Sequence, residues 1–209
     1  MEQILQTWIQ LFSDPITVIK AGGYMLIALL VFGESGVLIG IFFPGDSLLF
    51  AAGLLAAGDF LSFGPLVLLV VVAAILGDSV GYWFGTHVGP ALFRREDSRF
   101  FKQEYLKRTE QFYQKYGGRA LILARFVPIV RTLAPILAGV GSMEYRQFIS
   151  YNAIGGLLWG SGVVSLGFFL GNVIPNSDRY ILPLTLAVVV VSFIPILINF
   201  FRSERTEQT

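Results

Sequence analysis

The amino-acid sequence predicts an all-helical membrane protein made of two inverted repeats, each a re-entrant helical hairpin plus a transmembrane helix, with additional N- and C-terminal helices. Three observations predict this fold. The chain has 55% hydrophobic and only 14% charged residues, and its mean hydropathy is +0.69. It contains long uncharged segments, and other apolar segments are interrupted by proline and glycine. A soluble domain carries about 25% charged residues, which excludes an ordinary soluble fold.

Three segments are long and apolar enough to cross a bilayer, whose core of ~30 Å needs ~20 helical residues. They are residues 60–77 with an extension to about 86, residues 148–174 and residues 180–201. Residues 17–33 form a shorter candidate that contains a lysine. The first twenty residues predict an interfacial helix, and they lack the basic start of a signal peptide.

Two other apolar segments are interrupted where a span should be continuous. Residues 35–58 contain Pro44-Gly45-Asp46, and residues 120–141 contain Pro128 and Pro135. Proline removes a helical hydrogen bond, and Gly-Asp favours a turn or a cap. We therefore expect two re-entrant hairpins, broken at Pro44, Gly45, Pro128 and Pro135. Broken backbone is tolerated at membrane depth only where protein or water covers it.

The two halves of the chain resemble each other. Gly53 and Gly81 are 28 residues apart, as are Gly139 and Gly167. One crossing per hairpin is an odd number, which predicts that the second repeat is inverted. A single membrane domain, 1–209, is thus predicted to contain these parts: repeat 1 over about 34–86, a basic loop over 87–119, repeat 2 over about 119–174 and a C-terminal helix over 180–201.

Basic residues are concentrated in one loop. No lysine or arginine lies between Lys20 and Arg94, whereas residues 94–119 hold eight basic and four acidic residues. Such loops stay in the cytoplasm. This placement puts the C-terminus in the cytoplasm as well, and it puts the N-terminus there if residues 17–33 span the membrane.

Four charges lie in or beside the hairpins: Glu34 and Asp46 with the first, Arg125 and Arg131 with the second. A charge at a helix centre costs ~2.5–3.5 kcal/mol on insertion scales, so each is a candidate functional residue. Inverted hairpins would bring acids and arginines together as pairs. Two arginines beside a broken helix suit an anion, and phosphate matches the guanidinium fork best.

Each of these residues has a plainer interpretation. Asp46 could cap the second half-helix, Glu34 could lie in water at the interface, and the arginines could be structural partners of the acids. Asp78 is a secondary candidate. It is either a polar residue on a glycine-lined packing face or a proton-relay residue.

Other classes of function are disfavoured. The chain has no cysteine and one histidine, His87, so thiol chemistry and sites that need two histidines are excluded. Gly33-Glu34-Ser35-Gly36 matches the Gly-x-Ser-Gly of rhomboid proteases, but His87 is the only available base. We expect no enzyme activity, no metal, no cofactor and no nucleic-acid partner.

Several motifs resemble those of the DedA family, whose members share the VTT domain. They are 43–49 (FPGDSLL), 77–82 (GDSVGY), 105–118 (YLKRTEQFYQKYGG) and 124–132 (ARFVPIVRT) followed by Ala138-Gly139. The resemblance covers nearly the whole chain. It implies a bacterial inner-membrane protein in which Glu34 and Asp46 match essential acids and Arg125 and Arg131 match essential arginines.

The resemblance also implies a function. Some DedA proteins are implicated in recycling undecaprenyl phosphate, and eukaryotic relatives scramble phospholipids. We expect translocation of undecaprenyl phosphate or a similar anionic lipid, held by Arg125 and Arg131 and coupled to protons through Glu34 or Asp46. Alternatives are a proton- or cation-coupled exporter of small cationic or amphipathic molecules, a phospholipid scramblase and a membrane organiser without transport.

Overall fold

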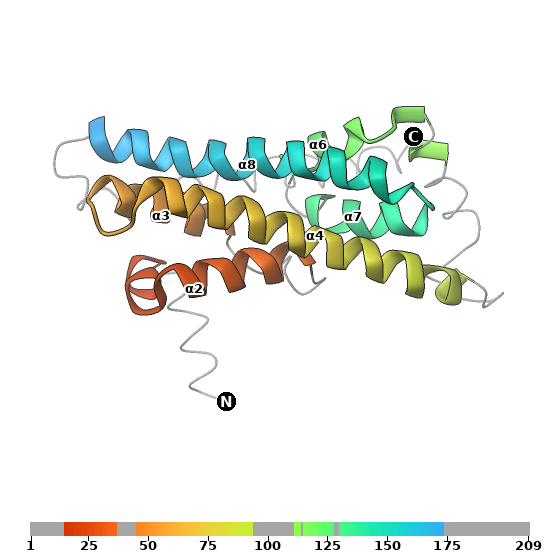
Figure 1. The fold of residues 1–209 in the computed structure, drawn as a ribbon, viewed down its shortest axis with the longest axis horizontal. Coiled ribbons are helices and arrows are strands. Elements are labelled where there is room, and N and C mark those ends of the chain that lie inside the picture. The colour runs from red at the N-terminus through yellow and green to blue at the C-terminus, as the bar shows by residue number, and fades with distance from the viewer. Residues whose placement is uncertain (1–14, 37–44, 94–110, 114, 128–129, 174–209) are drawn as a thin grey trace, which may run out of the picture. The chain divides into compact units, whose positions relative to one another are not determined.

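The computed structural model describes residues 15–36, 45–93, 111–113, 115–127 and 130–173 (Figure 1). All regular secondary structure among these residues is helical, which confirms the predicted class. The main elements are α2 (Pro15–Gly36), α3 (Gly45–Ala57), α4 (Phe63–Phe93), α6 (Arg119–Ala124), α7 (Val130–Val140) and α8 (Tyr145–Val173). Several predicted features lie outside the described residues: the N-terminal interfacial helix, Pro44, Pro128, most of the basic loop and the C-terminal helix over 180–201.

Helices α4 and α8 are long and apolar enough to cross a membrane, over Phe63–Val88 and Tyr145–Val173. They correspond to the predicted spans 60–86 and 148–174, although α4 continues to Phe93. Polar side chains within them bond to their own helix, since the Ser79 and Ser161 hydroxyls donate to the carbonyls four residues earlier. Satisfying such groups internally is what a bilayer requires.

The predicted span over 17–33 is interrupted. Helix α2 contains Gly23 at φ 53° and ψ −148°, a conformation outside the helical region that glycine tolerates. The apolar part that follows, Gly22–Gly36, is short for a membrane crossing.

The second predicted hairpin is broken between α6 and α7, but not at Pro135. Phe126 and Val127 donate their amides to carbonyls three residues earlier, and these tighter bonds end α6. Pro135 lies buried inside α7, which runs without interruption from Val130 to Val140. The predicted break at Pro135 is therefore wrong. Proline there removes only the bond to the Arg131 carbonyl, and the rest of the short helix remains intact.

The chain divides into two compact units that are interleaved in sequence. Unit 1 draws on residues 1–27, 44–69 and 162–209, and unit 2 draws on residues 28–43 and 70–161. In unit 1, α3 and α8 meet at Gly53 and Gly167. A Cβ atom on Gly53 would clash with the carbonyl oxygen of Val164, and one on Gly167 with that of Phe50. Only glycine permits this approach.

Unit 2 contains the same contact between α7 and α4. A Cβ atom on Gly139 would clash with the carbonyl oxygen of Tyr82, and one on Gly85 with that of Ile136. In both units each glycine meets the carbonyl of the residue three positions before the partner glycine. Gly139 therefore corresponds to Gly53, and Gly85 corresponds to Gly167. The sequence instead paired Gly81 with Gly167, one helical turn away. Because Gly81 and Gly85 lie four residues apart on one face, sequence spacing could not choose between them.

A glycine that touches the backbone of a neighbouring helix should respond differently to an added methyl group than a glycine with open space around it. We expect Gly139→Ala to lower stability by ~1–3 kcal/mol, because the methyl group overpacks a backbone contact. Gly162→Ala is the matched control in α8, since no atom lies within 4 Å of its added Cβ. Thermal unfolding in detergent measures both variants. Equal melting temperatures would contradict the proposed role of the α4–α7 contact.

Candidate functional site

The centre of the candidate site in unit 2 is a buried guanidinium group. Arg125 is 6% exposed and donates hydrogen bonds to Asp78 Oδ2 and Asn152 Oδ1. Asp78 and Asn152 are themselves buried. Asp78 and Arg125 therefore form an ion pair away from solvent, and Asn152 supplies a further neutral acceptor. A buried charge is tolerated when it is paired and hydrogen-bonded in this way.

Three elements deliver these side chains. Asp78 lies on α4, Arg125 follows the last residue of α6, and Asn152 lies on α8. The Asn152 amide donates to the Ile75 carbonyl at 3.1 Å, which fixes its oxygen towards Arg125. Gly155 makes room for the arginine, because a Cβ atom there would lie 2.9 Å from Arg125 Cδ. The small residues of α8 thus admit the long side chain.

A second ion pair joins Glu34 of α2 to Arg131 of α7. Glu34 is 3% exposed, whereas the side chain of Arg131 retains 14% exposure. The guanidinium carbon of Arg131 lies 5.0 Å from the ring centre of Trp159 on α8. This is a cation–π arrangement, and it gives Arg131 a second favourable contact that does not consume its hydrogen-bond donors.

Close packing of α2 on α4 positions the two acids in the same unit. A Cβ atom on Gly36 would lie 2.8 Å from the Gly77 carbonyl oxygen, and one on Gly77 would lie 2.6 Å from that of Phe32. Glycine on both sides lets the backbones approach. Asp78 follows Gly77 directly, so this packing also places the partner of Arg125.

The sequence anticipated part of this arrangement. Glu34 and Arg131 pair across the two predicted hairpins, and the burial of Glu34 rules out its interpretation as an acid solvated at the interface. Arg125, however, is bound by Asp78, which the sequence ranked second. Asp46 lies in the first turn of α3, in unit 1. An acid in the first turn of a helix stabilises the amide end of that helix, so this position fits the interpretation of Asp46 as a residue that stabilises the start of α3.

Sequence reasoning missed Asn152 and Trp159. Asn152 lies within an uncharged segment of 148–174, and an asparagine near Gly155 and Gly156 was a signal that an interhelical hydrogen bond was present. Because an amide is neutral, Asn152 did not stand out beside the charged candidates. Trp159 carried no signal, because a single tryptophan in an apolar helix does not indicate which residue its ring contacts.

These features define a helical membrane protein with ion pairs buried among its apolar helices. Comparison with known proteins agrees, because residues 43–169 match the VTT domain. The chain belongs to the DedA family.

Similar proteins come from several bacteria. Protein DedA of Escherichia coli K12 is 45% identical over 184 residues, covering 87% of this chain and 84% of that protein. A membrane protein of Mycobacterium tuberculosis H37Rv is 44% identical over 184 residues, covering 87% and 80%. Inner membrane protein YqjA of E. coli K12 is 34% identical over 173 residues, covering 82% and 79%. No solved structure matches the chain.

The buried ion pair predicts a non-additive response to mutation. We expect Arg125→Leu or Asp78→Leu alone to lower stability by ~3–5 kcal/mol, because each leaves an uncompensated buried charge. The double variant should lose less than the sum, since both charges are then absent. Unfolding in mixed micelles measures the cycle. Glu144→Gln is the control, because Glu144 is exposed. Strictly additive losses would contradict a direct Asp78–Arg125 interaction.

Proposed function

We propose that this protein translocates an anionic lipid across the inner membrane, with the lipid phosphate bound by Arg131 and Arg125. The observation that carries the proposal is the Glu34–Arg131 pair, a guanidinium group held among apolar helices yet partly exposed. A guanidinium fork matches the oxygens of a phosphate, and a water-poor site strengthens the contact. The hydrocarbon tail remains in the bilayer while the head group moves.

Proton coupling follows from the pairing. While Glu34 is ionised, it competes with a phosphate for the Arg131 guanidinium. Protonation of Glu34 removes the competing charge and makes Arg131 available to the lipid. Proton binding and lipid binding therefore favour each other, as linked equilibria require. Asp46 is the second proposed proton site, at the start of α3.

The proposed lipid is undecaprenyl phosphate, and the proposed frame is a pair of inverted repeats with re-entrant hairpins. The matching glycine contacts of α3 with α8 and of α7 with α4 support the repeat, because each hairpin helix packs on a long helix in the same register. Inverted repeats are the architecture in which transporters alternate access to a central site.

Other functions fit the site less well. An exporter of small cations needs carboxylates that face its substrate, but Glu34 and Asp78 each face an arginine. A phospholipid scramblase could use the same arginines without protons. An enzyme is not proposed, and no metal or cofactor is required by this cycle.

The proposed cycle predicts that the arginine is needed for lipid binding and that the acids are needed for proton-driven transport. Arg131→Ala should abolish binding of undecaprenyl phosphate, and Arg131→Lys should restore only part, because an ammonium lacks the planar fork. Glu34→Gln and Asp46→Asn mimic protonated acids, so binding should persist while proton-driven transport is lost. Purified protein in proteoliposomes, with labelled lipid and an imposed proton gradient, measures both quantities.

The control for this experiment is Arg146→Gln, which removes an exposed charge at the start of α8. Loss of binding in Glu34→Gln as complete as in Arg131→Ala would mean that the acid is only a structural partner. Lipid movement that ignores the proton gradient would favour the scramblase.

Membrane orientation gives a separate prediction. Reporters fused after Arg202 or inserted at Lys102 should both read as cytoplasmic, because basic segments remain on that side. A periplasmic reading at either position would contradict the proposed topology and the inverted repeats derived from it.

A further inference from the structure

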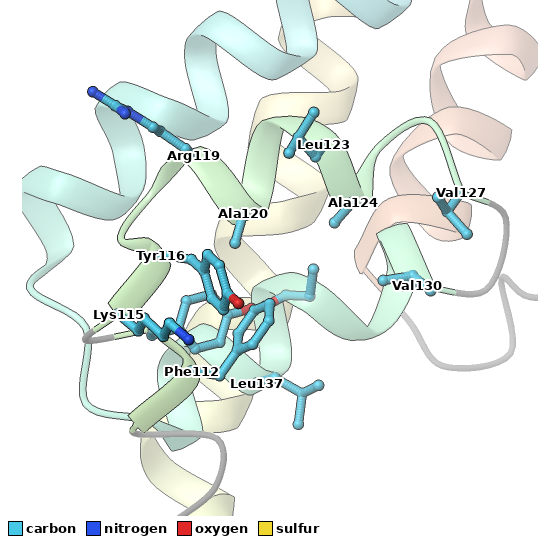
Figure 2. A pocket seen from close by; sticks show the side chains of 12 residues that line it. Phe112, Lys115, Tyr116, Arg119, Ala120, Leu123, Ala124, Val127, Val130 and Leu137 are labelled. Atoms are coloured by element: carbon cyan, nitrogen blue, oxygen red, sulfur yellow. The ribbon is translucent and has the colours of Figure 1, made fainter.

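Unit 2 contains an apolar groove that the ion pairs do not use. It has a volume of about 800 Å³ and lies between α6, α7 and the helical residues just before Gly117 (Figure 2). Its walls include Leu123, Val130 and Leu137, which are 70%, 45% and 38% exposed. This volume falls within the range of ~300–1,000 Å³ that is usual for small-molecule sites.

A glycine turn and a buried hydrogen bond fix the positions of the groove walls. Gly117 has φ 59°, and its amide donates to the Tyr113 carbonyl at 2.8 Å, so the chain turns sharply before α6. This is a left-handed helix cap, which suits glycine. The buried hydroxyl of Tyr113 donates to the Ala134 carbonyl of α7 at 2.8 Å. That bond ties one wall of the groove to the other.

One cation faces the groove. Lys115 and Arg119 are both exposed, but in Figure 2 Lys115 points towards Phe112 and Tyr116, whereas the Arg119 guanidinium points away from the other lining side chains. None of the lining residues is acidic. The Lys115 ammonium lies 5.2 Å from the ring centre of Tyr116, which also lines the groove. Apolar walls with a lysine beside them complement a molecule that joins a hydrocarbon chain to an anionic group. Basic side chains beside apolar surface are the usual pattern for binding anionic lipid.

We propose that this groove is a binding site for an anionic phospholipid, with an acyl chain against Leu123, Val130 and Leu137 and the head group beside Lys115. The site is separate from the Glu34–Arg131 pair and does not require that the bound lipid be transported. A neutral lipid would make only the apolar contacts. A preference for anionic over neutral lipid therefore distinguishes this site from ordinary contact with the bilayer.

Photocrosslinking of the full chain in nanodiscs tests this assignment. The probes are phosphatidylglycerol and phosphatidylcholine, each with a diazirine in the acyl chain, and adducts are mapped by mass spectrometry. We expect groove adducts to be at least fivefold more frequent with phosphatidylglycerol. Lys115→Gln should remove that preference, whereas Arg146→Gln, which removes an exposed cation outside the lining, should retain it. Ala120→Trp and, independently, Leu137→Trp should fill the groove and suppress its adducts severalfold.

Two results would overturn the proposal in correctly folded protein. One is equal labelling of the groove by both lipids, which indicates ordinary bilayer contact. The other is the absence of groove adducts with either lipid while other parts of the chain are labelled, which indicates that the groove is not open to lipid. Labelling is measured without transport, so the two proposals fail separately: Arg131→Ala should abolish transport and leave the groove adducts unchanged.

Discussion

The constraint on which unit 2 depends is that a guanidinium charge buried among apolar helices must be paired and hydrogen-bonded. Arg125 meets it with one charge and one amide, drawn from α4 and α8. Because Arg125 itself follows α6, a single side chain connects three elements that are distant in sequence. Moving any of them would leave a donor or an acceptor unsatisfied, and such groups are expensive where water is absent. The bonds of Arg125 therefore neutralise its charge and also fix the positions of α4, α6 and α8 around it.

Glycine makes that pairing possible. Helices in a membrane are not driven together by the hydrophobic effect, so close van der Waals contact and polar bonds hold them. Gly36 against Gly77 brings α2 onto α4, and Gly155 leaves space for Arg125 on α8. The same residues that allow backbones to touch thus bring carboxylates within reach of arginines. In this unit the ion pairs depend on the close packing of the helices. This explains why Gly77 directly precedes Asp78 in the sequence.

The sequence predicted those features that depend on local pattern. Long apolar segments located α4 and α8 correctly, and opposite charges on the two hairpins anticipated the Glu34–Arg131 pair. It failed where the answer depends on rotation about a helix axis. Arg125 and Arg131 are six residues apart and face different partners, which spacing alone could not assign. Pro135 likewise signalled a break, although one missing bond does not end α7.

The two arginines differ in a way that bears on the proposed cycle. Arg125 is bound by a carboxylate and an amide at 6% exposure, whereas Arg131 pairs with Glu34 and faces an aromatic ring at 14% exposure. In the proposed cycle a phosphate replaces the carboxylate at Arg131, the more exposed arginine, whose contact with Trp159 does not depend on the anion. With Glu34 protonated, the arginine and a singly charged phosphate sum to zero, as the arginine and carboxylate did before. The head group then replaces one ion pair with another, and no uncompensated charge enters the apolar region.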